Sequence, residues 1–127
     1  MTGPLAGCRV LDLGIITAGA ATSAMLADLG ADVIKVESPG YHDPFRRWSG
    51  PGGADDSPFF RFTNRNKQGI GTDIKRPEGR AVFMRLVARS DVVVENFRRG
   101  VLAKLGIDYP QLRAVRASNI LASLSSH

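Results

Sequence analysis

The sequence has few of the residues that mark several large classes of protein. It contains one cysteine, Cys8, and two histidines, His42 and His127, among 127 residues. A single cysteine excludes an internal disulfide framework and a cysteine-rich zinc site. No apolar run approaches the ~20 residues that span a bilayer, and the first residues lack the basic and then apolar pattern of a secretory signal. We therefore expect a cytoplasmic chain that binds neither a metal ion nor a membrane.

The composition is that of an ordinary globular domain. Hydrophobic residues make up 43% and charged residues 23% of the chain, which argues against disorder because there is enough apolar mass to form a core. The net charge is +5 and the pI is about 10.0. The length suits one domain over residues 1–127.

Apolar strands alternate with helical segments along the chain. The strands are predicted at Arg9–Gly14, Asp32–Glu37, Ile70–Ile74, Asp91–Glu95 and Ile120–Leu124. The helices are predicted at Gly19–Leu29, Glu78–Arg89 and Val101–Leu105, and from a cap at Asp108 to about Val115. Strand, helix and strand within ~30 residues form a right-handed unit with parallel strands. The sequence thus predicts an α/β fold, a Rossmann-like parallel sheet with helices on both faces, left incomplete because no helix follows the last strand.

Two segments between the second and third predicted strands depart from this alternation of strands and helices. Ser38–Ser57 is rich in glycine and proline, and a loop of this length in a compact domain is usually functional or mobile. The apolar stretch Pro58–Phe62 follows it without an assigned structure. In the helix at Glu78–Arg89, Val82 and Leu86 are expected to face inward, together with Phe83.

Ligands of open parallel sheets bind beyond the carboxyl ends of the strands. The turn Gly14–Gly19 lies at one such end; it is neither GxGxxG nor a P-loop, and packing alone explains its small residues better than anion binding does. Asp12, inside the first strand, needs a buried partner or an exposed end. An aspartate there more often orients backbone at the strand terminus than takes part in chemistry. No nucleophile–base pair can be assembled, so no catalytic residue is assigned.

Basic residues cluster outside the predicted strands and would form a cationic rim suited to a phosphorylated ligand. They are Arg46, Arg47, Arg61, Arg65, Lys67, Lys75, Arg76, Arg98, Arg99 and Lys104. For most of these arginines, solvated surface charge is the better interpretation. A nucleic-acid surface, with Phe59, Phe60 and Phe62 as stacking residues, is the weakest one because no nucleic-acid motif accompanies it.

Several stretches together resemble family III CoA-transferases of the CaiB/BaiF type. They are Pro4–Gly7, Arg9–Leu13, Ala18–Gly19, Leu26–Glu37, Asn64–Lys67, Asp73–Lys75, Pro77–Gly79 and Asp91–Phe97. The likeness covers essentially the whole chain, in order and spacing. It is specific for the family and not for the substrate.

The resemblance implies the N-terminal, coenzyme A-binding portion of such an enzyme, with coenzyme A as substrate and no covalently bound cofactor. The residues it implies at the coenzyme A site are Thr17, Ala18, Thr72, Asp73, Ile74, Lys75, Asn96, Phe97 and Lys104. Lys75 supplies positive charge to phosphate, and Thr17 and Ala18 approach the thioester end. Ile15 departs from the polar residue of many relatives, and Thr72 replaces a common leucine, so at that position only a backbone contact is implied.

The resemblance also places the catalytic aspartate of the family beyond His127. We therefore expect these residues alone to be inactive, whereas the complete protein would be a homodimer that moves coenzyme A from an acyl-CoA to a carboxylic acid. Two alternatives remain open at this point: an α-methylacyl-CoA racemase or isomerase of the same superfamily, and a non-catalytic coenzyme A-binding module.

Overall fold

The computed structural model describes residues 2–48 and 57–125. Its five strands form one sheet in the order β3-β2-β1-β4-β5, and every pairing between neighbours is parallel. The strands are β1 (Arg9–Asp12), β2 (Asp32–Glu37), β3 (Gln68–Gly71), β4 (Val92–Glu95) and β5 (Ile120–Ser123). The helices are α1 (Ala18–Asp28), η1 (Pro44–Arg47, a 3₁₀ helix), α2 (Pro58–Thr63), α3 (Pro77–Val87), α4 (Val101–Leu105) and α5 (Tyr109–Val115).

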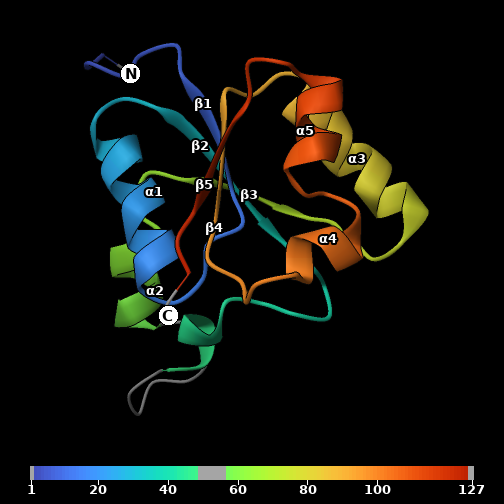
Figure 1. Ribbon diagram of the computed structural model, residues 1–127. Coiled ribbons are helices and arrows are strands. Elements are labelled where there is room, and N and C mark those ends of the chain that lie inside the picture. The colour runs from blue at the N-terminus through green and yellow to red at the C-terminus, as the bar shows by residue number, and fades with distance from the viewer. Residues whose placement is uncertain (1, 49–56, 126–127) are drawn as a thin grey trace.

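The helices cover both faces of the sheet, as predicted. Helices α1 and α2 lie on one face, and α3, α4 and α5 lie on the other (Figure 1). This division follows from right-handed crossovers. The connection from β1 to β2 runs towards one edge of the sheet, whereas the connections from β3 to β4 and from β4 to β5 run towards the other, so their helices fall on opposite faces.

Alternate residues of the central strands pack into two hydrophobic cores, one on each face of the sheet. Leu11 and Val93 pack on the side of α3 and α5, around the fully buried Phe83. Val10 and Val94 face the other side, where they meet Ala27 of α1. Because both faces of the central strands are covered, these strands are nearly continuous runs of apolar residues, and the sequence shows them clearly.

The inward face of α3 differs in part from the prediction. Phe83 and Val87 are fully buried, whereas Val82 and Leu86 are only partly buried. Residues four apart share one face of a helix, and here the face of Phe83 and Val87 is the one turned to the sheet. Leu86 packs at the margin of the same core.

The predicted strand at Ile70–Ile74 was wrong by two to three residues. The observed strand β3 is set by its pairing with β2, in which Ile34 lies beside Gln68 and Glu37 beside Gly71. Thr72 N then donates to Glu37 O, and the chain turns at Asp73, whose Oδ1 accepts from Lys75 N. The side chain of Ile74 is buried in the core and anchors this turn.

Part of the predicted loop at Ser38–Ser57 contains structure, and its residues 49–56 lie outside the described residues, as does His127. Pro44–Arg47 forms η1, which Asp43 caps by accepting from Phe45 N at 3.0 Å. Pro58–Thr63 is helix α2, with Ser57 as its cap and Pro58 in the first turn. A serine followed by a proline favours a helix start, although no helix was predicted at this position.

The start of α3 leaves no space for a side chain at Gly79, because a Cβ atom there would overlap the carbonyl of Asp73. We expect Gly79→Ala to lower the free energy of unfolding by about 2 kcal/mol, although alanine normally favours a helix. Gly69→Ala is the matched control, since nothing lies within 4 Å of its added Cβ. Urea denaturation followed by circular dichroism measures both. Equal stability of the two variants would contradict this packing.

Candidate functional site

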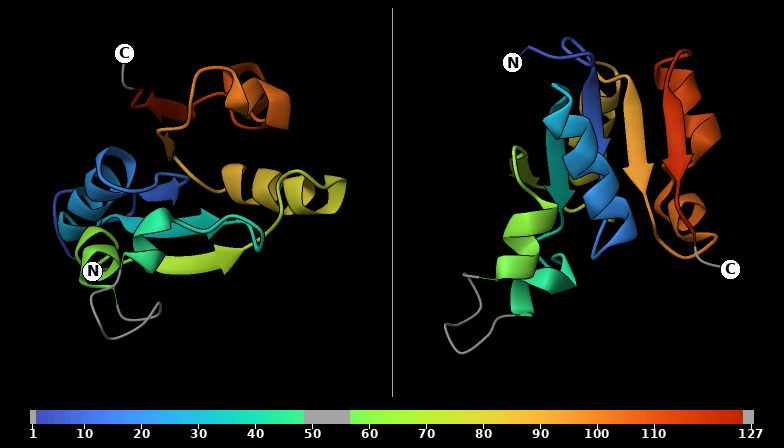
Figure 2. Two further views of the ribbon diagram at one scale, coloured as in Figure 1. Left: turned by 90° about the horizontal axis from the view of Figure 1, so that it is seen from below. Right: turned by 90° about the vertical axis from the view of Figure 1, so that its left-hand side faces the viewer.

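The carboxyl ends of the strands meet at one edge of the sheet. In the right-hand view of Figure 2 the arrows point the same way, with α2 and η1 gathered at that edge. From β1 the chain proceeds outward to β2 and β3, and then it returns to β4 on the other side of β1. The connections that follow β1 and β4 therefore leave in opposite directions. This is the point where open parallel sheets form their ligand crevice.

Asn96 links the end of β4 to the turn that follows β1. It directly follows β4, and its side chain reaches the turn after β1, where Oδ1 accepts from Ile15 N at 2.8 Å and Nδ2 donates to Ile15 O at 2.9 Å. Gly14 and Gly19 bring the turn and the start of α1 into backbone contact, and a Cβ atom on Gly19 would lie 2.5 Å from Asn96 Oδ1. The packing interpretation of these two glycines is confirmed.

Two buried ion pairs lie beneath the same turn. Lys35 Nζ bonds Asp43 Oδ2 at 2.9 Å, with 4% and 0% of the two side chains exposed. Lys67 Nζ bonds Asp12 Oδ2 at 2.7 Å, with 2% and 0% exposed. Asp12 also accepts from Gly14 N at 2.7 Å. Of a buried partner and an exposed end, the buried partner is confirmed, and so is the orientation of backbone at the strand terminus.

Lys67 is therefore not available to an external anion, contrary to the prediction of a cationic rim that includes it. Its other contacts are with Ala20 O at 2.8 Å and Asn64 Oδ1 at 2.9 Å, so all three donors of the ammonium group are used. Burial lowers the pKa of Lys67 from its ordinary 10.5, and the attraction of Asp12 opposes that shift.

Two of the arginines in the predicted rim are also held by acids. Arg46 pairs with Glu37 at 2.7 Å, and Arg65 pairs with Asp28 at 2.6 Å. Five other basic side chains of the predicted rim lie on the loops after β3 and β4 and on α4. They are exposed and carry no ion pair among the described residues: Lys75, Arg76, Arg98, Arg99 and Lys104. These five are called the edge cations below.

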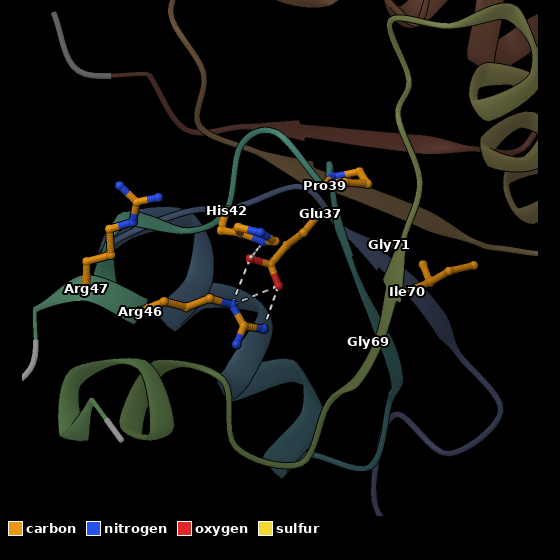
Figure 3. A pocket seen from close by; sticks show the side chains of 8 residues that line it. All are labelled: Glu37, Pro39, His42, Arg46, Arg47, Gly69, Ile70 and Gly71. Atoms are coloured by element: carbon orange, nitrogen blue, oxygen red, sulfur yellow. Dashed lines mark hydrogen bonds and ion pairs between the residues drawn. The ribbon is translucent and has the colours of Figure 1, made fainter. Parts of the chain in front are cut away.

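An open hollow of about 520 Å³ lies beside the ends of β2 and β3 (Figure 3). Glu37, His42 and Arg46 border it on one side, and Gly69, Ile70 and Gly71 of β3 on the other. Glu37 accepts from Arg46 Nη2 at 2.7 Å and from Asp43 N at 2.9 Å, and His42 Nδ1 lies 3.7 Å away. The two glycines leave the backbone of β3 open to a flat or extended ligand.

The site residues implied by the resemblance fall on the carboxyl edge of the sheet. Thr17 and Ala18 begin α1; Thr72, Asp73, Ile74 and Lys75 follow β3; Asn96 and Phe97 follow β4; Lys104 lies on α4. Since β3 and β4 are three strand spacings apart, the second and third groups are separated by about 14 Å. Only a long ligand could touch them all.

Several of these side chains are already engaged within the protein. The hydroxyl of Thr72 donates to Gly79 O at 3.2 Å, and the side chain of Ile74 lies in the core. Both could therefore meet a ligand only through backbone atoms. Thr17, Ala18, Lys75 and Lys104 are exposed, and Phe97 is half-buried.

Lys35 and Asp43 were not among the site residues predicted from the sequence. Lys35 had a readable signal, since a lysine inside a strand covered on both faces must be paired. Its partner had none, because Asp43 lies in the loop after β2 and nothing local indicates that it turns back beneath β1.

Within residues 2–48 and 57–125, no helix is long and apolar enough to cross a bilayer. In the same residues, no three or more histidine, cysteine, aspartate or glutamate side chains are grouped so that they could hold a metal ion.

Comparison with known proteins defines the class. A family model described as CoA-transferase family III matches residues 5–127. The chain is 44% identical to succinate–glutarate CoA-transferase of Agrobacterium fabrum over 96% of its own length and 32% of that protein. It is 41% identical to acetyl-CoA:oxalate CoA-transferase of Acetobacter aceti over 97% of the chain and 31% of that protein.

Solved structures agree with this assignment. A CAIB/BAIF family protein from Brucella suis is 43% identical, with a TM-score of 0.87 over 97% of the chain and 33% of that structure. A hypothetical protein from Mycobacterium tuberculosis is 35% identical, with a TM-score of 0.88 over 98% of the chain and 34% of that structure. The chain belongs to CoA-transferase family III, and it spans about a third of the length of these relatives.

The Glu37–Arg46 pair predicts a pH dependence of stability. Burial raises the pKa of Glu37, but bonds from Arg46 and Asp43 N outweigh it and leave the pKa below the ordinary 4.5. The stabilisation is thus present above pH 4.5 and is lost as the pH falls through the lowered pKa. We expect Glu37→Gln to cost about 1 kcal/mol at neutral pH and to flatten the loss of stability in acid.

Unfolding free energies from urea titrations at neutral and acid pH test this expectation. Glu78→Gln is the control for loss of one negative charge, because Glu78 is exposed and forms no ion pair among the described residues. A Glu37→Gln variant whose stability falls in acid as steeply as that of the unaltered chain would refute the assignment.

Proposed function

We propose that this chain is the coenzyme A-binding portion of a CoA-transferase that moves coenzyme A from an acyl-CoA to a carboxylic acid. In that exchange the thiol sulfur leaves the donor acyl carbon and bonds to the carboxyl carbon of the acceptor. One oxygen of the acceptor carboxylate passes to the donor, which departs as a carboxylate. The named relatives that are CoA-transferases support the reaction class. The edge cations along the carboxyl edge of the sheet carry the proposal for the ligand.

Coenzyme A is an extended molecule with a phosphorylated nucleotide at one end and a thiol at the other. Its phosphates need cations, and its length suits groups spread over about 14 Å of sheet edge. We assign the phosphates to Lys75 and Lys104, which are both exposed and carry no ion pair among the described residues. The backbone at Thr72, Asp73 and Ile74 would approach the nucleotide.

The thiol end would then lie at the point where the connections that follow β1 and β4 diverge. Thr17 and Ala18 are exposed there at the first turn of α1, whose backbone N–H groups point out of the helix end. Phe97 offers an apolar surface beside Asn96. In this assignment Asn96 shapes the turn, because both ends of its amide are already bonded to Ile15.

The resemblance also supports a cytoplasmic homodimer for the complete protein.

Removing the charge of Lys75 tests the ligand assignment. We expect Lys75→Gln to weaken coenzyme A binding about tenfold, since a charge-assisted contact to phosphate is lost. Arg113→Gln removes the same charge from an exposed position near the end of α5, and it should leave the affinity unchanged. Calorimetric titration with coenzyme A measures both, and equal affinities of the two variants would refute the role of Lys75.

A second expectation concerns turnover. These 127 residues should bind coenzyme A without transferring it, because the resemblance places the catalytic aspartate of the family beyond His127. An assay with glutarate and the coenzyme A thioester of succinate, the two acids named for one relative, would follow the acyl-CoA products by chromatography. Repeated turnovers by the purified chain would overturn this expectation and leave the binding proposal standing.

A further inference from the structure

Ile16, in the turn before α1, has a backbone conformation that its residue type strongly disfavours. Its φ is +58°, in the left-handed region that glycine adopts freely and β-branched residues almost never do. The next residue, Thr17, is the cap of α1, and its side chain makes no capping hydrogen bond. A strained residue thus sets the direction in which the chain enters the helix.

Three buried or partly buried side chains hold the backbone of this turn one residue after another. Lys35 Nζ donates to Gly14 O at 2.9 Å. Asn96 bonds both Ile15 N and Ile15 O. Asp43 Oδ1 accepts from Ile16 N at 3.1 Å, while its other oxygen bonds Lys35.

These contacts are non-local, and that is why they can impose a strained conformation. Lys35 lies on β2, Asp43 precedes η1 and Asn96 follows β4, so each holds the turn from a different part of the fold. Unfavourable backbone conformations persist only where the surrounding structure over-determines them, and they cluster at functional sites. An isoleucine released from these bonds would return to negative φ and rotate the peptide that leads into Thr17.

We propose that the buried Lys35–Asp43 pair is a positioning device: it holds Ile16 left-handed, so that Thr17 and Ala18 face the crevice in the orientation that coenzyme A requires. This inference rests on the proposed function for its ligand. The competing explanation is that the pair only stabilises the fold. The two explanations predict different effects of Ile16→Gly on the affinity for coenzyme A when the pair is removed.

The test removes both charges together, so that neither is left buried alone. In the double variant Lys35→Met/Asp43→Ala, Gly14 O and Ile16 N lose these bonds. We expect coenzyme A to bind about tenfold more weakly, because only a minority of molecules keep the competent turn. Adding Ile16→Gly should recover most of that loss, since glycine adopts positive φ without penalty. In the unaltered background Ile16→Gly should not raise the affinity.

Arg9→Met/Asp32→Ala is the matched control. It removes another ion pair, 2.7 Å long, at the amino ends of β1 and β2, and it should not change the affinity. If Lys35→Met/Asp43→Ala does not fold, Lys35→Met/Asp43→Asn keeps an acceptor for Ile16 N. That variant should bind about threefold more weakly, with the same recovery by Ile16→Gly.

Calorimetry with coenzyme A measures the affinities, and the ¹³Cα shift of Ile16 without ligand reports its backbone conformation. Weaker binding, recovery by Ile16→Gly and a changed Ile16 shift support the inference. Unchanged affinity in a folded double variant, a loss that Ile16→Gly does not recover, or an unchanged Ile16 shift overturns it and leaves the proposed function intact. No binding by the unaltered chain overturns the proposed function and this inference with it.

Discussion

The reversal of strand order between β1 and β4 is the constraint on which the rest of this structure depends. Once the chain has placed β2 and β3 on one side of β1, β4 must return to the other side. Right-handed crossovers then send α1 and α3 to opposite faces. The connections that follow β1 and β4 separate beyond the ends of these two central strands. The backbone of the turn after β1 therefore has no neighbouring strand with which to form hydrogen bonds. Asn96 and the Lys35–Asp43 pair supply those missing bonds from the side.

A charged pair suits the task of bonding this turn, because the backbone of the turn presents donors and acceptors in close succession. Gly14 presents a carbonyl, Ile15 presents both groups, and Ile16 presents an amide. A lysine and an aspartate can each bond the backbone and one another at the same time. Such a buried pair adds little net stability, because desolvation offsets the attraction, but it strongly disfavours any arrangement that separates the two charges. It therefore selects one conformation.

The sequence predicted best where packing and local preference agree. The valines of β4, the apolar run of β2 and the small residues of α1 indicated their elements to within about a residue at most boundaries. The position of β3 was wrong because its glycines have little preference of their own, and pairing with β2 decides the register. Helix α2 was missed although Ser57 and Pro58 signal its start.

The site was harder to predict, since distant partners decide which charges are available. Arg46, Arg65 and Lys67, like Lys75, are basic residues outside the predicted strands. Each of the three, however, has an acidic partner that only the fold brings close.

The contact of Asn96 with the turn has a consequence for which positions around it can change. Because both ends of one amide are committed to Ile15, and the two glycines below leave no room for a methyl group, the frame of the crevice tolerates little change. Thr17 and Ala18 project from that frame and share none of its hydrogen bonds through their side chains. Mutation can therefore alter these two positions without disturbing the scaffold that presents them.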